Sequence, residues 1–342
     1  MENGPNIRIV GAVPEEVKEA TRNKIKKNLF DHAESLDEGE KEALKKQEYS
    51  KSKIEIALID FANQETSRLM QEAGVEPYAI PLDNVHIIPP ELFRRIAKVD
   101  DAGQAKRITE GIAINADYTR ANPVTFGSTV LHEILHLKAH LSMEMQKENE
   151  QEHETIYRMG VTVNATVKNI LEGRDHSHFK ALHEAIVAET EKRLIPRLLA
   201  HPELAKEKEW MLSEKAEELK RQIAKEHHIH VDDIIWVEQK EKLKFEAVGY
   251  KTQREVLSYV CTEIQKQFPD QFASNDDVSK LFINANFTGR LLPIARLVEK
   301  TFGEGSFRLL GNMGTNRESA VLTMDSLKKA RIREGKKSID TV

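Results

Sequence analysis

Residues 130–140 read VLHEILHLKAH and contain two histidines four positions apart, with a glutamate directly after the first. On an α-helix, residues four apart lie on one face, about 6 Å from each other along the axis. His132 and His136 can therefore direct their imidazoles at one metal ion, with Glu133 beside that ion. The pattern is typical of zinc hydrolases. With 13 histidines in 342 residues it can also arise by chance, so its surroundings must decide.

The surrounding segment, residues 119–146, predicts the helix that this pattern needs. Asn122 can cap the N-terminus of the helix, and Pro123 suits its first turn. The apolar residues that would form its buried side are Val130, Leu131, Ile134, Leu135 and Leu137. His132 and His136 fall off the densest part of this apolar side and are expected to face a cleft or solvent.

Composition limits the class of protein. A chain of 342 residues with 39% hydrophobic residues can form a proper core. The single cysteine, Cys261, excludes an intrachain disulfide and suits a reducing compartment. The sequence contains no apolar run long enough for a membrane span, and a net charge of −5 argues against a nucleic-acid-binding protein. We therefore expect a soluble cytoplasmic protein without membrane or nucleic-acid partners, and the sequence leaves its oligomeric state open.

The order of expected elements predicts an α+β fold with a small mixed sheet. Strands are predicted for residues 54–61, 84–89 and 111–118, and a helix for residues 63–74. A second long helix is predicted for residues 178–200, which Pro196 should kink or end. Residues 154–167 are expected to be extended or a hairpin, and residues 234–239 can pair with residues 242–250.

Changes in composition along the chain predict four parts. A charged helical segment covers residues 1–52, and the α+β core with the active-site helix covers residues 53–200. A charged helical insertion follows at residues 201–240, and a helical C-terminal subdomain at residues 241–342.

A catalytic zinc generally has three protein ligands, so a third ligand is needed. His140 lies eight residues after His132, about 12 Å along a helix, which is too far for one ion. Ser142 stands where the metzincin arrangement has its third histidine, and this excludes that class. The helix at residues 178–200 offers Glu184 or, as the alternative, His183. Glu184 is preferred, because an inward-facing carboxylate on a helix that crosses the first completes a His-His-Glu set.

The sequence resembles the gluzincin metallopeptidases, of which thermolysin is a member, and within them the compact minigluzincins. The likeness rests on HEILH and, some fifty residues later, HEAIVAE, and it covers residues 53–200. It implies a zinc ion bound by His132, His136 and Glu184. It also implies that Glu133 is the general base that acts on a zinc-bound water.

Two positions depart from the pattern of that family. His183 stands where thermolysin-like members have asparagine, and Ala188 where they have an aspartate that orients a zinc-binding histidine. Glu189 or another carboxylate can replace this aspartate; otherwise metal binding is weakened.

The resemblance implies a zinc-dependent peptidase that hydrolyses peptide bonds of a peptide or protein substrate. Tyr157, Arg158 and Tyr250 are candidates for the group that stabilises the oxyanion. The strand that ends near Asn115 is expected to lie along the cleft and to bind an extended peptide.

Two other hypotheses remain open. The chain can be a catalytically degenerate relative that acts as a binding or regulatory module, which Ala188 and the charged helices favour. Alternatively it binds no metal, and the helix is an ordinary one. The natural substrate, and whether a terminal segment blocks the cleft, do not follow from the sequence.

Overall fold

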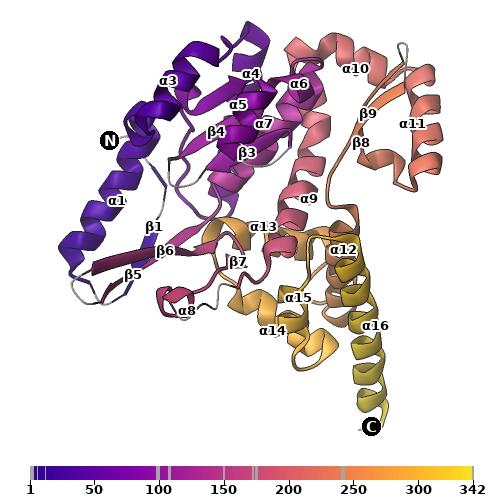
Figure 1. The fold of residues 1–342 in the computed structure, drawn as a ribbon. Coiled ribbons are helices and arrows are strands. Elements are labelled where there is room, and N and C mark those ends of the chain that lie inside the picture. The colour runs from indigo at the N-terminus through magenta and orange to yellow at the C-terminus, as the bar shows by residue number, and fades with distance from the viewer. Residues whose placement is uncertain are drawn as a thin grey trace.

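The computed structural model describes residues 4–5, 7–11, 13–97, 101–106, 109–148, 151–171, 173, 176–239 and 243–340. Helices dominate, and three small sheets occur in these residues (Figure 1). The predicted α+β class is therefore confirmed. None of the described helices is long and apolar enough to cross a membrane.

The N-terminal part is helical after one short strand. Its elements are β1 (Ile7–Val10), α1 (Glu15–Phe30), α2 (His32–Ser35) and α3 (Glu38–Gln47). Strand β1 pairs in parallel with β5 (Leu141–Glu148), so that Ile7 lies opposite Leu141. Sheet pairing thus ties the beginning of the chain to the residues that follow the HEILH helix.

One predicted strand is wrong. Residues 54–61 belong to a long helix, α4 (Lys53–Glu72), which also includes most of the helix predicted for residues 63–74. Ser52 and Glu55 form a capping box at its start, in which each side chain accepts a hydrogen bond from the backbone of the other. These local bonds, together with packing of α4 on the HEILH helix, outweigh the β-propensity of the isoleucines.

A second sheet has three strands in the order β2-β4-β3. Strand β4 (Gly111–Asn115) is central, pairs in parallel with β2 (Val85–Ile88) and is antiparallel to β3 (Gly103–Lys106), which forms the edge. The strand predicted for residues 84–89 is confirmed in β2. The one predicted for residues 111–118 is confirmed for residues 111–115 in β4, whereas residues 116–118 are helical. The connecting elements are a 3₁₀ turn at Leu82–Asn84, α5 (Pro90–Ala97) and α6 (Ala116–Thr119).

The predicted HEILH helix is confirmed as α7 (Pro123–Leu137), but it is shorter than the sequence indicated. The Asn122 side chain accepts hydrogen bonds from the backbone of Val124 and Thr125, and Pro123 is the first helical residue. The helix ends at Leu137, and residues 141–146 form β5 instead of continuing it. Strand β5 pairs with β6 (Gln151–Met159), which pairs with β7 (Thr162–Val163), followed by α8 (Val167–Leu171).

The second predicted long helix is confirmed as α9 (Lys180–Leu199). Pro196 lies inside it, and α9 continues to Leu199, so the proline does not end the helix. A charged region follows, with a 3₁₀ turn at Pro202–Leu204, α10 (Ala205–Met211), α11 (Glu214–His227) and a 3₁₀ turn at Val231–Asp233. The expected hairpin is confirmed in β8 (Ile234–Gln239) and β9 (Leu243–Ala247).

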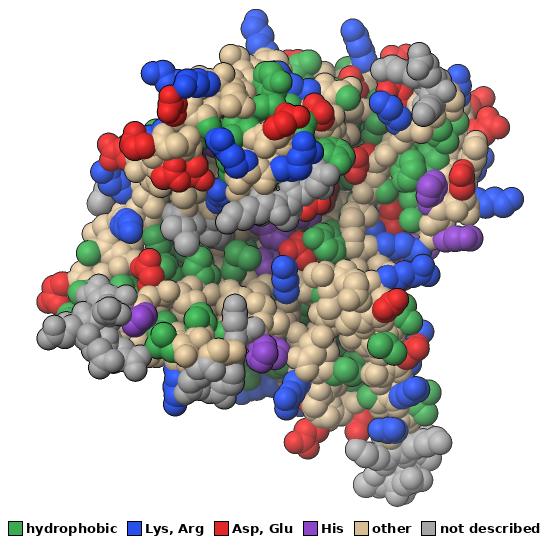
Figure 2. All heavy atoms as spheres, in the orientation of Figure 1, with side chains coloured by type: hydrophobic (Ala, Val, Ile, Leu, Met, Phe, Trp, Pro, Cys, Tyr) green, Lys and Arg blue, Asp and Glu red, His purple; other side chains and the backbone are tan. Residues whose placement is uncertain are grey.

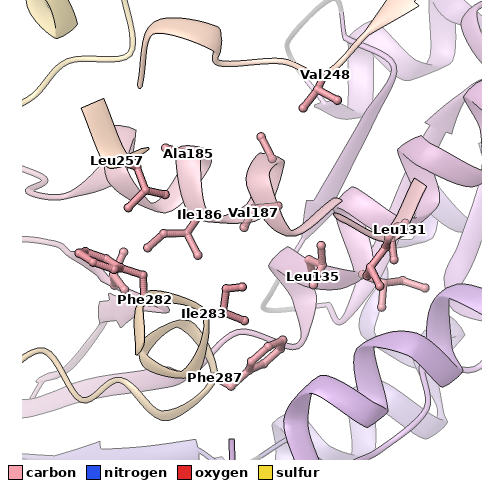
Figure 3. Close-up of a cluster of buried hydrophobic side chains, with 14 of the residues drawn as sticks. Leu131, Leu135, Ala185, Ile186, Val187, Val248, Leu257, Phe282, Ile283 and Phe287 are labelled. Carbon is pink, nitrogen blue, oxygen red and sulfur yellow. The ribbon is translucent and has the colours of Figure 1, made fainter. Parts of the chain in front are cut away.

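From residue 251 to residue 340 the structure describes five helices: α12 (Lys251–Gln267), α13 (Asn275–Thr288), α14 (Leu292–Phe302), α15 (Ser306–Gly311) and α16 (Arg317–Asp340). Helices α12 and α13 pack on α9, and α9 packs on α7. Figure 3 shows part of the shared core, which includes Leu131 and Leu135 of α7, Ile186 of α9 and Phe287 of α13. This packing fixes the two helices that hold the predicted metal ligands.

Candidate metal centre

Helix α7 presents its two histidines on one face. Its opposite side is buried, with Val130, Leu131, Ile134 and Leu135 at most 1% exposed. The side chains of His132 and His136 are only partly covered, at 18% and 13% exposure. The sequence thus predicted correctly which side of the helix turns away from the core.

Helix α9 brings Glu184 to the same point. The Nε2 atoms of His132 and His136 lie 3.1 Å apart. Oε2 of Glu184 is 3.2 Å from Nε2 of His136 and 3.9 Å from Nε2 of His132. One nitrogen from each histidine and one oxygen from the glutamate therefore face one another across a small triangle.

The size of this triangle matches a zinc site. A triangle with these three sides has a circumradius of about 2.0 Å, so one point lies about 2.0 Å from all three atoms, the length of Zn–N and Zn–O bonds. A His-His-carboxylate set is also the donor set of catalytic zinc in thermolysin-type enzymes, where a fourth position stays open. The residues present thus fit a metal ion by both distance and chemistry.

Electrostatics within the triangle keep the carboxylate ionised. Burial alone would raise the pKa of Glu184, but the adjacent imidazoles, His136 first, lower the pKa to about 2. The glutamate is therefore negatively charged at neutral pH, as a metal ligand must be.

His132 is fixed from behind by Glu191 of α9. Oε2 of Glu191 lies 2.9 Å from Nδ1 of His132, and the Ser128 hydroxyl donates a hydrogen bond to Oε1. Burial disfavours the imidazolium form of His132, but Glu191 more than offsets this effect and raises the pKa of His132 to about 9. Position 188 is alanine, and Glu191 provides the carboxylate that contacts His132 in place of the aspartate that gluzincins have there. Glu189, the candidate named from the sequence, forms ion pairs with Arg193 and Arg254 instead.

Glu133 lies beside the triangle, on the face of α7 that meets the edge strand β3. Its side chain is buried, and burial raises its pKa. A Cβ atom at Gly103 would lie 2.9 Å from Cγ of Glu133 and 2.8 Å from Cγ2 of Thr129. Only glycine at this position lets β3 run so close to α7. Glu133 therefore has the position and the raised pKa that suit a general base.

A cleft of about 460 Å³ opens onto this cluster. Figure 2 shows a hollow near the centre of one face in which histidine and acidic side chains are visible. The cleft is lined by residues of β3 and the segment before it, by α7 and α9, and by the β8–β9 hairpin with the residues after it. The strand beside the cleft is β3, not β4 as expected, because β4 is paired on both sides.

Of the three residues considered for stabilising the oxyanion, one lines the cleft and two do not. Tyr250 lines the cleft, and it lies close enough to Glu184 to feel the charge of that carboxylate. Burial and the charge of Glu184 raise the pKa of Tyr250, so it remains a proton donor at neutral pH. Tyr157 and Arg158 lie on β6 and do not line the cleft. The structure thus brings only Tyr250 of these three to the cluster.

The other histidines considered as ligands have different contacts. Nδ1 of His183 lies 2.9 Å from the Thr162 hydroxyl, and its buried ring packs edge-on against His136, with 4.9 Å between ring centroids. His140 follows the end of α7, and its Nε2 lies 2.8 Å from Oγ of Ser142. Neither histidine contributes to the triangle.

Two features of the site were not predicted from the sequence. One is Glu191, which lies seven residues after Glu184 and so on the same helix face, a spacing that could have identified it. The other is the edge strand β3, whose sequence GQAK has no strand pattern. No family model, no curated protein and no solved structure matches the chain.

Proposed function

We propose that this protein is a zinc-dependent peptidase of the gluzincin type. The observation that carries the proposal is the meeting of His132, His136 and Glu184 from two helices, with ligand atoms at zinc-site distances, beside a buried glutamate in an open cleft. Zinc is proposed because its tetrahedral sites favour imidazole and carboxylate ligands. The cytoplasmic location remains part of the proposal, and the buried, unpaired Cys261 supports it.

The residues around the cluster divide the work of amide hydrolysis. When bound, zinc would supply Lewis-acid polarisation of water and of the scissile carbonyl. Glu133 takes the proton of the attacking water and passes it to the leaving nitrogen. Tyr250 donates a hydrogen bond to the oxygen that gains negative charge. The free edge of β3 offers backbone groups to an extended peptide, which places the scissile bond over the cluster.

The alternative of a degenerate binding module drew its support from Ala188 and from the charged helices, and the site bears on the first of these. Glu191 offers His132 the carboxylate that position 188 lacks. The argument from Ala188 therefore loses its force, and hydrolysis is the function that the geometry supports best.

The test compares the wild type with Glu133→Gln on a peptide library. We expect the variant to retain zinc and to lose about 10²- to 10⁴-fold of kcat, the usual contribution of a general base. Glu218→Gln, an exposed position on α11, is the matched control and should cleave like the wild type. Equal activity of wild type and Glu133→Gln would rule the peptidase out.

A further inference from the structure

Glu246 is an acidic residue in the cleft that the proposed mechanism does not use. It lies on β9, where side chains alternate between the two faces of the hairpin. Phe245 packs into the small core beneath α11, while Glu246 lines the cleft. The hairpin thus inserts one carboxylate into the cavity that contains the candidate metal centre.

Glu246 differs from Glu184 and Glu191, two other acids of the cleft, in its partners. Glu184 faces the two histidines, and both oxygens of Glu191 are used by His132 and Ser128. No lysine or arginine among the described residues forms an ion pair with Glu246. Burial, and next the charge of Glu191, raise the pKa of Glu246. A half-buried carboxylate without a cation is costly, so a cationic group that enters the cleft is stabilised there.

The position of Glu246 relative to the metal centre follows from α9. Glu246 is close enough to Glu191 to feel its charge, and Glu191 lies about 10 Å along the helix from Glu184. Lys180, the lysine that lines the cleft, is one turn before Glu184 and so at the opposite end. It cannot neutralise Glu246. The cleft is therefore acidic on one side of the metal centre.

The walls around Glu246 fit a long cationic side chain. Ile235 and Ala247 of the hairpin contribute apolar side chains to the lining. Thr125 and Ser128 of α7 add polar groups to the lining. Lysine and arginine combine an apolar stem with a charged end, which is the shape and polarity of this space.

We infer that Glu246 forms an acidic subsite that selects a lysine or arginine side chain of the peptide substrate near the scissile bond. This inference rests on the proposed peptidase function, because it names the substrate class of the same cleft. The metal ligands set where the bond is cut, and Glu246 sets which sequences are held there.

The experiment uses fluorogenic peptides that carry lysine, norleucine or glutamate at each position around the cleaved bond. At one position, we expect the wild type to prefer lysine over norleucine by about 10- to 100-fold in kcat/KM, the range for a hydrogen bond to a charged group. Glu246→Gln should lose this preference, and Glu246→Lys should favour glutamate instead. Glu238→Gln, on the same hairpin but outside the cleft, is the matched control. Unchanged selectivity in both Glu246 variants would overturn the inference.

A binding measurement separates this inference from the proposed function. Fluorescence anisotropy with the Glu133→Gln protein reports peptide affinity without turnover. If the wild type cleaves no peptide but lysine peptides bind Glu133→Gln tighter, and Glu246→Gln in this background removes the difference, the subsite stands and the peptidase proposal fails. If peptides are cleaved but affinity is insensitive to charge at residue 246, the peptidase stands and the subsite fails.

Discussion

At the scale of single residues, Glu191 determines how His132 is oriented. Its carboxylate accepts a hydrogen bond from Nδ1–H of the ring, which leaves Nε2 toward His136 and Glu184. Ser128 holds the other oxygen of the same carboxylate. Hydrogen bonds of this kind fix the tautomer of a ligating histidine and increase its basicity.

We therefore expect Glu191→Gln to weaken zinc binding by about 10- to 100-fold, as is usual when such a partner is lost. The dissociation constant is measured by competition with a chromophoric chelator. Glu189→Gln is the matched control, because Glu189 is paired with arginines and does not contact His132. Equal weakening by both variants would show that Glu191 has no special part in the site.

The ligands were predictable to different degrees. His132, Glu133 and His136 follow from helical spacing alone, because one short segment fixes their relative positions. Glu184 rested on the assumption that a second helix crosses the first with this carboxylate inward, and on the resemblance to gluzincins, since no local rule brings two helices together. Positions 188 and 191 lie on the same face of α9 as Glu184, and the helix crossing decides which of them reaches His132. The geometry of this helix crossing depends on tertiary packing and cannot be derived from the sequence alone.

At the scale of elements, local capping and long-range pairing explain where the predictions succeeded or failed. The Ser52–Glu55 capping box marked the start of α4, although the isoleucines of residues 54–59 indicated a strand. In β5, the side chains of Leu141, Met143 and Met145 alternate inward, which is a strand pattern. This pattern was missed because the segment reads as a continuation of the preceding helix. Strand β3 has no such pattern and forms because β4 offers it an edge.

A histidine pair connects the N-terminal helices to the β2-β4-β3 sheet. Nε2 of His32 in α2 lies 2.8 Å from Nε2 of His86 in β2, and Nδ1 of His86 lies 3.0 Å from Glu48. His32 is also near the carbonyl of Thr109, at 2.5 Å, the Ser35 hydroxyl, at 3.4 Å, and the carboxylates of Glu48 and Glu40. Burial, and next the charge of His86, lower the pKa of His32. The neutral form is therefore the one that fits the fold.

Because the pKa of His32 is lower in the folded than in the unfolded state, its contribution to stability is full above the unfolded pKa, about 6.5, and is lost as the pH falls. His132, whose pKa is raised, gains stability as the pH falls in both proteins, so the comparison is the difference between them. We expect the free energy of unfolding of the wild type, relative to that of His32→Asn, to decrease between pH 7.5 and pH 5. Urea titrations across this range measure it. His230→Asn, an exposed position, should keep the full dependence. Identical pH profiles of wild type and His32→Asn would contradict this role.

At the scale of the whole molecule, the site lies where the separate parts of the fold meet. Strand β3, at the edge of the β2-β4-β3 sheet, and the β8–β9 hairpin border the cleft. The C-terminal helices α12, α13 and α15 contact α9, and Figure 1 shows them around its lower end. Each part supplies one component of the proposed site: β3 the edge proposed to bind peptide, α7 and α9 the candidate ligands, and the segment after the hairpin Tyr250. Sequence reasoning found the components on α7 and α9, and proposed Tyr250 among three candidates, but it could not place the hairpin across the cleft.

The most direct test of the central claim is X-ray absorption at the zinc K-edge on protein loaded with one equivalent of zinc. The account predicts that zinc is retained through dialysis, with two imidazole nitrogens and carboxylate and solvent oxygens at about 2.0–2.2 Å. His136→Ala and Glu184→Ala should each change this shell. Zinc that is lost on dialysis, or a shell without two imidazoles, would contradict the metal centre and the hydrolytic function that depends on it.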